Sequence, residues 1–139
     1  MIERMHGLHL MADLRGVDAA LPVMLDTAAL RALCLHAVRA AGLHAVGESF
    51  HRFPPPGGIT GVVLLAESHV AIHTWPELQG VTLDVYVCHA RADNSAAAQA
   101  IQAALEAAFA PTTVLRHRLQ RGVSNPDAAD TTGGADPGP

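Results

Sequence analysis

Ionisable and hydroxyl side chains with the potential for chemistry gather in one short part of this chain. The tripeptide Glu67-Ser68-His69 follows the apolar run 61–65 after one alanine, and a second histidine, His73, comes four residues after His69. A serine hydroxyl is a weak nucleophile, so it reacts only with help from a neighbouring base, positioned donors or backbone strain. Histidine can supply the base because its ordinary pKa lies near neutral pH. Polar residues this close to an apolar run indicate a functional site.

Further residues surround this tripeptide at distinctive spacings. Before it stands Gly58-Ile59-Thr60-Gly61-Val62-Val63, after it stands His73-Thr74-Trp75-Pro76-Glu77, and Cys88 ends the next apolar run. Together these segments resemble the self-processing segment of the bacterial and archaeal S-adenosylmethionine decarboxylases, and the likeness extends over residues 7–122. The resemblance implies a carboxy-lyase that is made as an inactive precursor and that carries a pyruvoyl group.

The resemblance implies that the chain cuts its own backbone between Glu67 and Ser68. In this chemistry Ser68 Oγ attacks the carbonyl carbon of Glu67, and an ester replaces the peptide bond. β-Elimination then releases Glu67 as the C-terminus of a β chain, residues 1–67. The dehydroalanine left at position 68 hydrolyses to ammonia and a pyruvoyl group, which begins the α chain, residues 68–139. As a covalent cofactor, this group forms a Schiff base with the substrate amine and withdraws electrons as carbon dioxide leaves.

The same resemblance implies roles for four more side chains. His73 is the proton acceptor during processing, and Thr60 supports processing at a position where the family usually has serine. Cys88 is the proton donor in decarboxylation, with a small core residue as the alternative interpretation. Glu67 also contributes negative charge near a cationic substrate. The role of His69 stays open between structural and catalytic.

The substrate pocket matches the family less closely than the processing segment does. Relatives commonly carry Phe-x-Pro-x-Gly, in which the aromatic ring stacks on adenine. Here Phe53 stands one residue further from Gly58, so its ring either stacks on a nucleobase or packs in the core. The expected reaction converts S-adenosylmethionine to S-adenosylmethioninamine for spermidine biosynthesis. The alternative is decarboxylation of a basic amino acid, ornithine or arginine, on the same scaffold.

Hydrophobic periodicity predicts the elements that hold these residues. Strands are expected over residues 7–14, 43–53, 59–66, 70–74, 81–88 and 112–120. Asp26 or Thr27 begins a helix that runs to Ala41 and buries Cys34 on its apolar stripe. A second helix begins within 93–95 and ends before Pro111.

This order of elements predicts the fold class and the assembly. We expect a two-layer α/β (α+β) sandwich, in which a mainly antiparallel sheet carries two helices on one face. Residues 1–122 form a single domain, and residues 123–139, which are poor in apolar side chains, form a disordered tail. Since the second face of the sheet needs a cover, the protein is expected to be a homodimer that forms a larger sandwich.

Composition argues against several other classes of protein. The chain has 139 residues, half of them apolar, which suffices for one domain with a core. Its net charge is −4 with scattered Lys and Arg, which argues against a nucleic-acid or anionic-membrane surface. No apolar run approaches the roughly 20 residues of a membrane span, and no signal peptide is evident, so a cytoplasmic protein is expected.

Two rival interpretations belong to other functional classes. One is a zinc site assembled from His69, His73, Cys88 and His89. It is disfavoured because the histidine pair lies on a predicted strand, and no metal is expected. The other is a non-catalytic subunit that stays as one unbroken chain.

Overall fold

The strands and helices occur in nearly the order that hydrophobic periodicity predicts. The computed structural model describes residues 4–126. The elements are β1 (Arg4–Arg15), α1 (Pro22–Leu25), α2 (Thr27–Ala40), β2 (Ala45–Arg52), β3 (Ile59–Leu65), β4 (Ser68–Trp75), η1 (Pro76–Leu78), β5 (Gly80–Cys88), α3 (Ser95–Phe109) and β6 (Thr113–Ser124). Asp26 caps α2 by accepting a hydrogen bond from the Ala28 amide, 3.0 Å away. The short helices α1 and η1 were not predicted.

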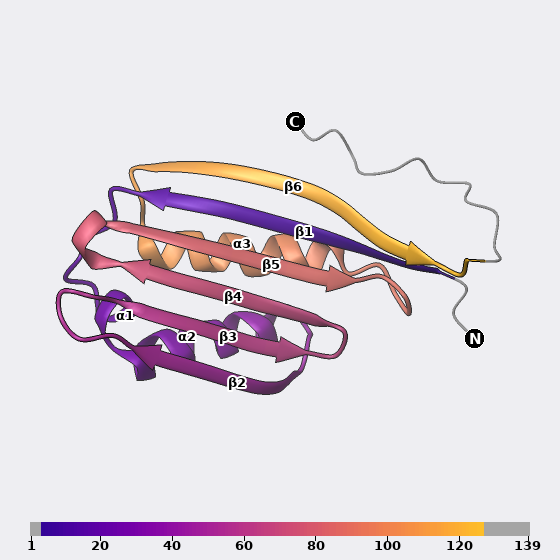
Figure 1. Cartoon of the computed structure of the whole chain (residues 1–139), viewed down its shortest axis with the longest axis horizontal. Coiled ribbons are helices and arrows are strands. Elements are labelled where there is room, and N and C mark those ends of the chain that lie inside the picture. Colours follow the sequence, from indigo (N-terminus) through magenta and orange to yellow (C-terminus); the bar gives the residue numbers. More distant parts are fainter. Residues whose placement is uncertain (1–3, 127–139) are drawn as a thin grey trace.

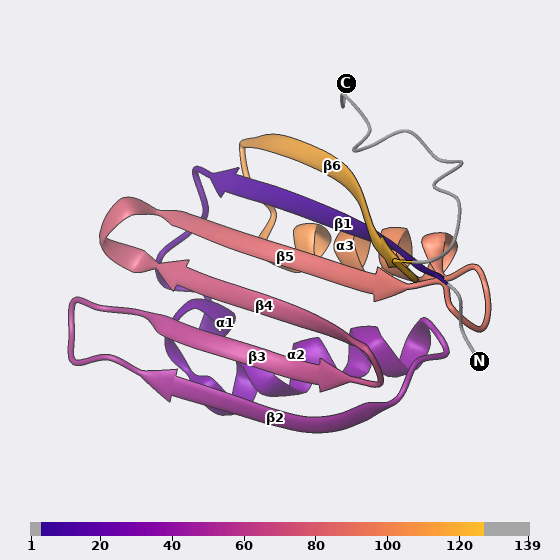
Figure 2. The same cartoon turned by 45° about the vertical axis from the view of Figure 1, so that its right-hand side comes forward.

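All six strands join one antiparallel sheet in the order β2-β3-β4-β5-β1-β6 (Figures 1 and 2). Strands β2 to β5 follow one another as a meander, and β1 lies between β5 and β6. Strand β4, which begins at Ser68, therefore lies between β3 and β5, the strand that ends at Cys88. The predicted antiparallel sheet is confirmed.

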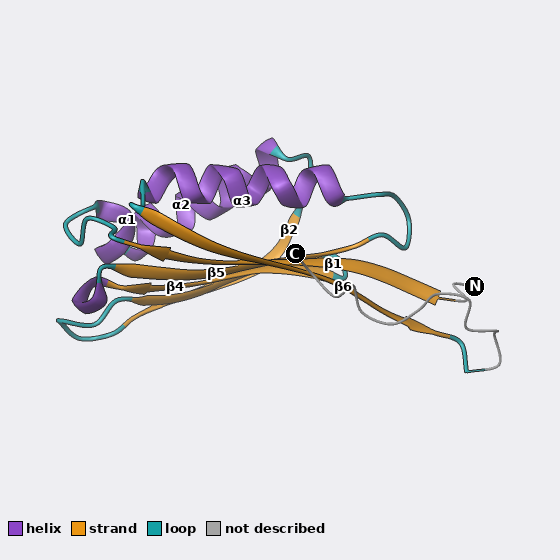
Figure 3. Ribbon diagram, turned by 90° about the horizontal axis from the view of Figure 1, so that it is seen from above, coloured by secondary structure: helices purple, strands orange, loops and turns teal. Residues whose placement is uncertain are grey.

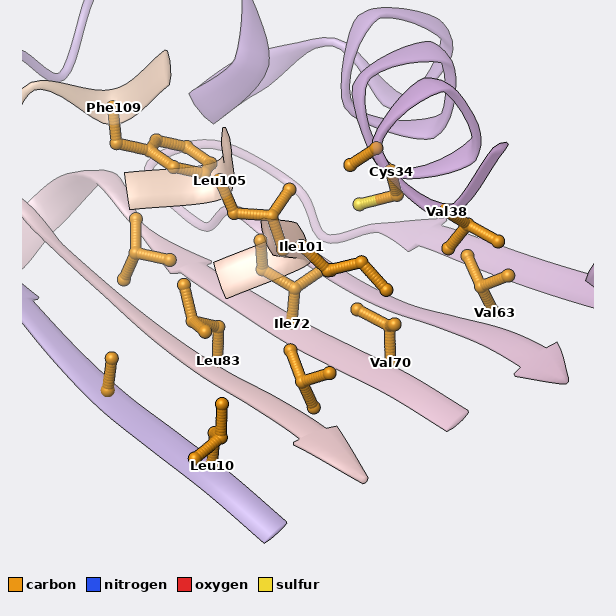
Figure 4. Packing of buried hydrophobic residues seen from close by; sticks show 14 of the residues in the cluster. Leu10, Cys34, Val38, Val63, Val70, Ile72, Leu83, Ile101, Leu105 and Phe109 are labelled. Carbon is orange, nitrogen blue, oxygen red and sulfur yellow. The ribbon is translucent and has the colours of Figure 1, made fainter. Parts of the chain in front are cut away.

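Helices α2 and α3 cover the same face of the sheet, as predicted (Figure 3). Residues of α3 three or four positions apart form the apolar stripe of an amphipathic helix. Figure 4 shows Ile101, Leu105 and Phe109 facing Ile72 and Leu83 of the sheet. Each of these side chains is at most 1% exposed. Burial of one such side chain stabilises the fold by about 1.5–3 kcal/mol, which fixes the strand register beneath the helices.

A buried threonine connects α1 to the β3–β4 hairpin. Thr74 Oγ1 donates to the Met24 carbonyl oxygen at 2.9 Å and accepts from the Ile59 amide at 2.8 Å. Both bonds are buried, so the hydroxyl satisfies two backbone groups that would otherwise lose their hydration. The unpredicted helix α1 is thus bound to the strands that carry the candidate site.

Two glycines of the motif are required by close packing. A Cβ atom at Gly58 would collide with the Thr74 carbonyl oxygen and the Pro76 ring. A Cβ atom at Gly61 would collide with the ring of Phe50, which faces it from β2. These glycines let β2, β3 and the chain after β4 approach closely.

The sheet face opposite the helices, here called the open face, has no helix over it within residues 4–126 (Figure 3). Because side chains alternate along a strand, the register assigns to this face four large apolar residues that are 43–69% exposed: Leu64, Trp75, Leu115 and Val123. The predicted start of the tail at residue 123 is wrong, because β6 continues through Ser124. The rest of the predicted tail, from residue 127, lies outside the described residues.

Candidate active site

The bond that precedes Ser68 lies in a two-residue turn between β3 and β4. The register pairs Leu65 with Ser68, which leaves Ala66 and Glu67 as the turn. Glu67 has a φ of 60°, in the left-handed region that non-glycine residues rarely adopt. A positive φ at the second central residue is a feature of type II turns, which favour glycine there. Holding glutamate in this conformation costs roughly 1–3 kcal/mol, so strain is stored beside Ser68.

Ser68 and Cys88 are joined by a hydrogen bond across neighbouring strands. The Cys88 amide donates to Ser68 Oγ at 3.0 Å, and the Ala90 amide donates to Cys88 Sγ at 3.3 Å. Cys88 is 5% exposed, whereas Glu67 is exposed. We call Glu67, Ser68 and Cys88 the turn-end cluster. It holds the Ser68 hydroxyl and the Cys88 thiol close to a residue with a strained backbone.

Thr60, His73 and Phe53 form a second group, here called the far-end cluster. Thr60 Oγ1 and His73 Nδ1 are hydrogen-bonded at 3.1 Å across the β3–β4 pair. All three residues line a pocket of about 230 Å³, together with Trp75 and Glu77. Phe53 is 46% exposed, so the alternative that its ring packs in the core is wrong.

The two clusters lie at opposite ends of the β3–β4 hairpin. His73 follows Ser68 by five residues of extended chain, which corresponds to about 17 Å. Alternation also assigns Ser68 to the helix side of β4 and His73 to the open face. Thr60 and Ser68 do not share a face of the sheet, because the turn at Ala66 and Glu67 reverses the chain between them.

Four side chains form a cluster on the open face, between the strand ends. His9 Nε2 and Asp84 Oδ1 are 3.2 Å apart, and the rings of His69 and Tyr86 are 5.6 Å apart. Burial lowers the pKa of His69 below its ordinary value; nearby His9 lowers it further, and Asp84 partly opposes this. The register of β5 places Asp84, Tyr86 and Cys88 on the same face of that strand. His9 was not predicted as a site residue, although it lies in the alternating segment predicted as the first strand.

The two cysteines have different surroundings. Cys34 lies 1% exposed on the buried stripe of α2, as predicted, and burial raises the pKa of its thiol to about 12. Among residues 4–126, no three His, Cys, Asp or Glu side chains are arranged to hold a metal ion. In the same part of the chain, no helix is long and apolar enough to cross a membrane. Cys34 is thus a core residue, and Cys88 is the cysteine of the candidate site.

Comparison with known proteins identifies the class. A sequence profile described as S-adenosylmethionine decarboxylase matches residues 8–122. The chain is 40% identical over 118 residues to an S-adenosylmethionine decarboxylase proenzyme of Hydrogenobaculum sp., covering 84% of this chain and 82% of the relative. It is 33% identical over 125 residues to the proenzyme of that name from Pyrococcus furiosus, covering 90% and 85%.

A solved structure agrees with these relatives. The crystal structure of the adenosylmethionine decarboxylase from Aquifex aeolicus matches with a TM-score of 0.70 and 31% sequence identity, covering 91% of this chain and 96% of that one. The fold and the matched sequence define a decarboxylase of the carboxy-lyase class. The chain belongs to the S-adenosylmethionine decarboxylase family.

Proposed function

We propose that this protein cleaves its own backbone between Glu67 and Ser68 and then decarboxylates S-adenosylmethionine. The product would be S-adenosylmethioninamine, the aminopropyl donor for spermidine biosynthesis. The observation that carries the proposal is the left-handed φ of Glu67 beside a Ser68 hydroxyl that the Cys88 amide holds at 3.0 Å. Membership of the family supports the substrate.

The turn-end cluster supports cleavage at this particular bond. Attack by Ser68 Oγ on the Glu67 carbonyl carbon breaks the peptide bond next to the strained φ of Glu67 and forms an ester. The strain is then released, because the two chain ends separate once elimination follows. The Cys88 amide limits the motion of the hydroxyl and so keeps it close to its own preceding carbonyl.

The surroundings of Ser68 fit the pyruvoyl group that the family implies. The group would replace Ser68 at the start of β4, beside the Cys88 thiol and the exposed Glu67. Its carbonyl supplies an electron sink for decarboxylation. Cys88 would donate a proton to the substrate, with the Ala90 amide orienting its sulfur at 3.3 Å. Glu67, as the new C-terminus of the β chain, would attract the positive charge of a sulfonium.

His73 and Thr60 can assist Ser68 only from a second copy of the chain, because their own Ser68 is about 17 Å away along β4. We therefore propose a homodimer packed through the open face. A two-fold axis between the sheets and perpendicular to the strands would bring the β3–β4 turn of one subunit to the far-end cluster of its partner. Because Ser68 lies on the helix side at the first position of β4, the partner's His73 would approach it around the end of the sheet. Exposed Leu64, Trp75 and Leu115 on this face favour such burial.

The far-end cluster supports an adenine-containing substrate. Phe53 presents an exposed ring beside the pocket that Thr60, His73 and Trp75 line. An exposed aromatic ring is a suitable surface for stacking on a nucleobase. The family match also favours S-adenosylmethionine over the alternative of ornithine or arginine. Both cysteines are free thiols, which fits a reducing compartment and supports a cytoplasmic enzyme.

Mass spectrometry of the purified protein tests the cleavage step. We expect two fragments that meet between Glu67 and Ser68, the second starting with a pyruvoyl group. The Ser68→Ala variant should remain one chain, because alanine has no hydroxyl to attack the carbonyl. A wild-type chain that stays intact after prolonged incubation would refute the proposal.

Release of labelled carbon dioxide tests the substrate. Processed protein is incubated separately with carboxyl-labelled S-adenosylmethionine, ornithine and arginine. We expect release from S-adenosylmethionine alone. Release only from an amino acid would contradict the substrate assignment and leave self-cleavage intact.

A further inference from the structure

All three polar atoms of Cys88 are engaged by neighbouring groups. Its amide donates to Ser68 Oγ at 3.0 Å, and its sulfur accepts from the Ala90 amide at 3.3 Å. Its carbonyl oxygen accepts from the Asn94 carboxamide, Nδ2, at 2.8 Å. The position of both the Ser68 hydroxyl and the thiol therefore depends on how the backbone at Cys88 is held.

The carboxamide of Asn94 does not make the hydrogen bond that is usual at the start of a helix. Asn94 is the N-cap residue of α3, where asparagine normally accepts a hydrogen bond from the first turn of the helix. Its side chain makes no such capping bond and reaches back to Cys88 instead. Asp93, one residue earlier, accepts from the Ser95 amide at 2.9 Å. The Asn94 side chain is therefore available to bind the end of β5, where it donates to the Cys88 carbonyl oxygen.

His89, in the loop between β5 and α3, forms hydrogen bonds to the sheet and to the start of the helix. Its Nδ1 accepts from the Asn94 amide at 3.0 Å, which leaves Nε2 protonated and 3.5 Å from Ser95 Oγ. The His89 amide donates to the His6 carbonyl oxygen of β1 at 2.7 Å. The loop between β5 and α3 is therefore bonded both to the sheet and to the start of the helix.

We propose that Asn94 and His89 are positioning residues for both stages of the reaction, because they fix the backbone from which Cys88 holds Ser68. Before cleavage, this loop aligns the Ser68 hydroxyl through the Cys88 amide. After cleavage, the same loop aligns the thiol that donates the proton. The catalytic consequence rests on the proposed function, whereas the positioning of the thiol can be measured in the uncleaved chain.

The isosteric change Asn94→Asp tests the first stage. The carboxylate keeps the shape and the capping ability of the residue but cannot donate to the Cys88 carbonyl oxygen. Self-cleavage, followed by mass spectrometry after cell-free synthesis, should slow about tenfold or more. Asp93→Asn, an exposed change in the same loop, is the matched control and should cleave at the wild-type rate.

Alkylation of the thiol in the Ser68→Ala precursor tests the same contacts without any cleavage or decarboxylation. Iodoacetamide should modify Cys88 about fivefold faster when Asn94→Asp is added, because the loop no longer buries the thiol. Cys34 serves as the unreactive reference in the same molecule, since burial raises the pKa of its thiol to about 12. Equal alkylation rates together with wild-type cleavage would overturn the inference.

A second pair of variants distinguishes loss of positioning from misfolding. His89→Asn offers an oxygen where Nδ1 accepts from the Asn94 amide, whereas His89→Leu offers none. We expect Leu to slow cleavage severalfold and Asn to restore most of the rate at equal melting temperature. Equal rates for the two would contradict the inference. Failure of the wild type itself to cleave would instead refute the proposed function, and the alkylation result would still stand.

Discussion

The two ends of the β3–β4 hairpin carry different parts of the candidate site. The turn-end cluster combines a strained backbone at Glu67 with a hydroxyl and a buried thiol, and backbone amides donate to both of these side chains. The far-end cluster combines a histidine, a threonine and an exposed aromatic ring around a pocket. One end contains the bond that we propose is broken, and the other contains groups suited to moving protons and stacking on a flat substrate. In the proposed function each end needs the groups of the other, and for this reason we propose two subunits.

Co-expression of two inactive variants tests whether the far-end cluster of one subunit acts on the turn-end cluster of the other, and it should give the largest effect. His73→Ala should slow self-cleavage by about 100-fold or more, since it removes the base. Co-expression with Ser68→Ala should restore cleavage, because a mixed dimer pairs an intact Ser68 with His73 of the partner subunit. Up to about half of the His73→Ala chains should then be cut, as random pairing places that share in mixed dimers.

The mixed-dimer experiment has a clear contrary outcome. Chains of the two variants are distinguished by mass, and their dimers are separated by size exclusion. If dimers form and no His73→Ala chain is cut, then His73 does not act across subunits. A monomer that cleaves at the wild-type rate would contradict the proposed dimer directly.

Removing the thiol separates cleavage from decarboxylation at the turn end. Cys88→Ala should cleave within about threefold of the wild-type rate, because the backbone amide that holds Ser68 remains. Turnover of S-adenosylmethionine should fall by about 100-fold, the usual contribution of a positioned proton donor. Cys34→Ala serves as the control, since Cys34 lies in the core and should change only stability. Equal loss of cleavage and turnover would show that the sulfur itself is needed before the chain is cut.

Relieving the strain at Glu67 should have a smaller effect. Glu67→Gly and Glu67→Ala both remove the carboxylate, but only glycine adopts a φ of 60° without cost. In the Ser68→Ala background, glycine should therefore raise the free energy of unfolding by about 1 kcal/mol relative to alanine. With Ser68 present, it should slow cleavage severalfold. Urea unfolding and cleavage time courses measure the two effects. Equal cleavage rates for Glu67→Gly and Glu67→Ala would show that backbone strain at Glu67 does not promote cleavage.

The smallest expected effect concerns His69 on the open face. Its pKa in the folded protein is lower than the ordinary 6.5, so the unfolded chain binds more protons between the two values. The free energy of unfolding should therefore decrease as the pH falls through 6.5. In the Ser68→Ala background, His69→Gln should weaken this decrease between pH 8 and pH 5. Identical urea midpoints for both proteins across this range would show that His69 does not titrate differently on folding.

Much of the fold was predictable because its elements are locally encoded. Alternating apolar residues specified β4 and β5, and the helical stripe specified the burial of Cys34. Asp26 marked the start of α2 for a local reason, its bond to the Ala28 amide. The short helix α1 escaped prediction because four residues show no period, and its position depends on the distant hydroxyl of Thr74.

The sequence by itself determined which residues are the candidates for the chemistry. The order Thr60, Glu67, Ser68, His73 and Cys88 is a one-dimensional pattern within the segment that matches the family. Only the tertiary structure decided which of them meet. The turn at Glu67 folds the chain back on itself, so residues eight positions apart separate while Ser68 and Cys88, twenty positions apart, come within one hydrogen bond. Strand pairing, unlike spacing along the chain, sets those distances.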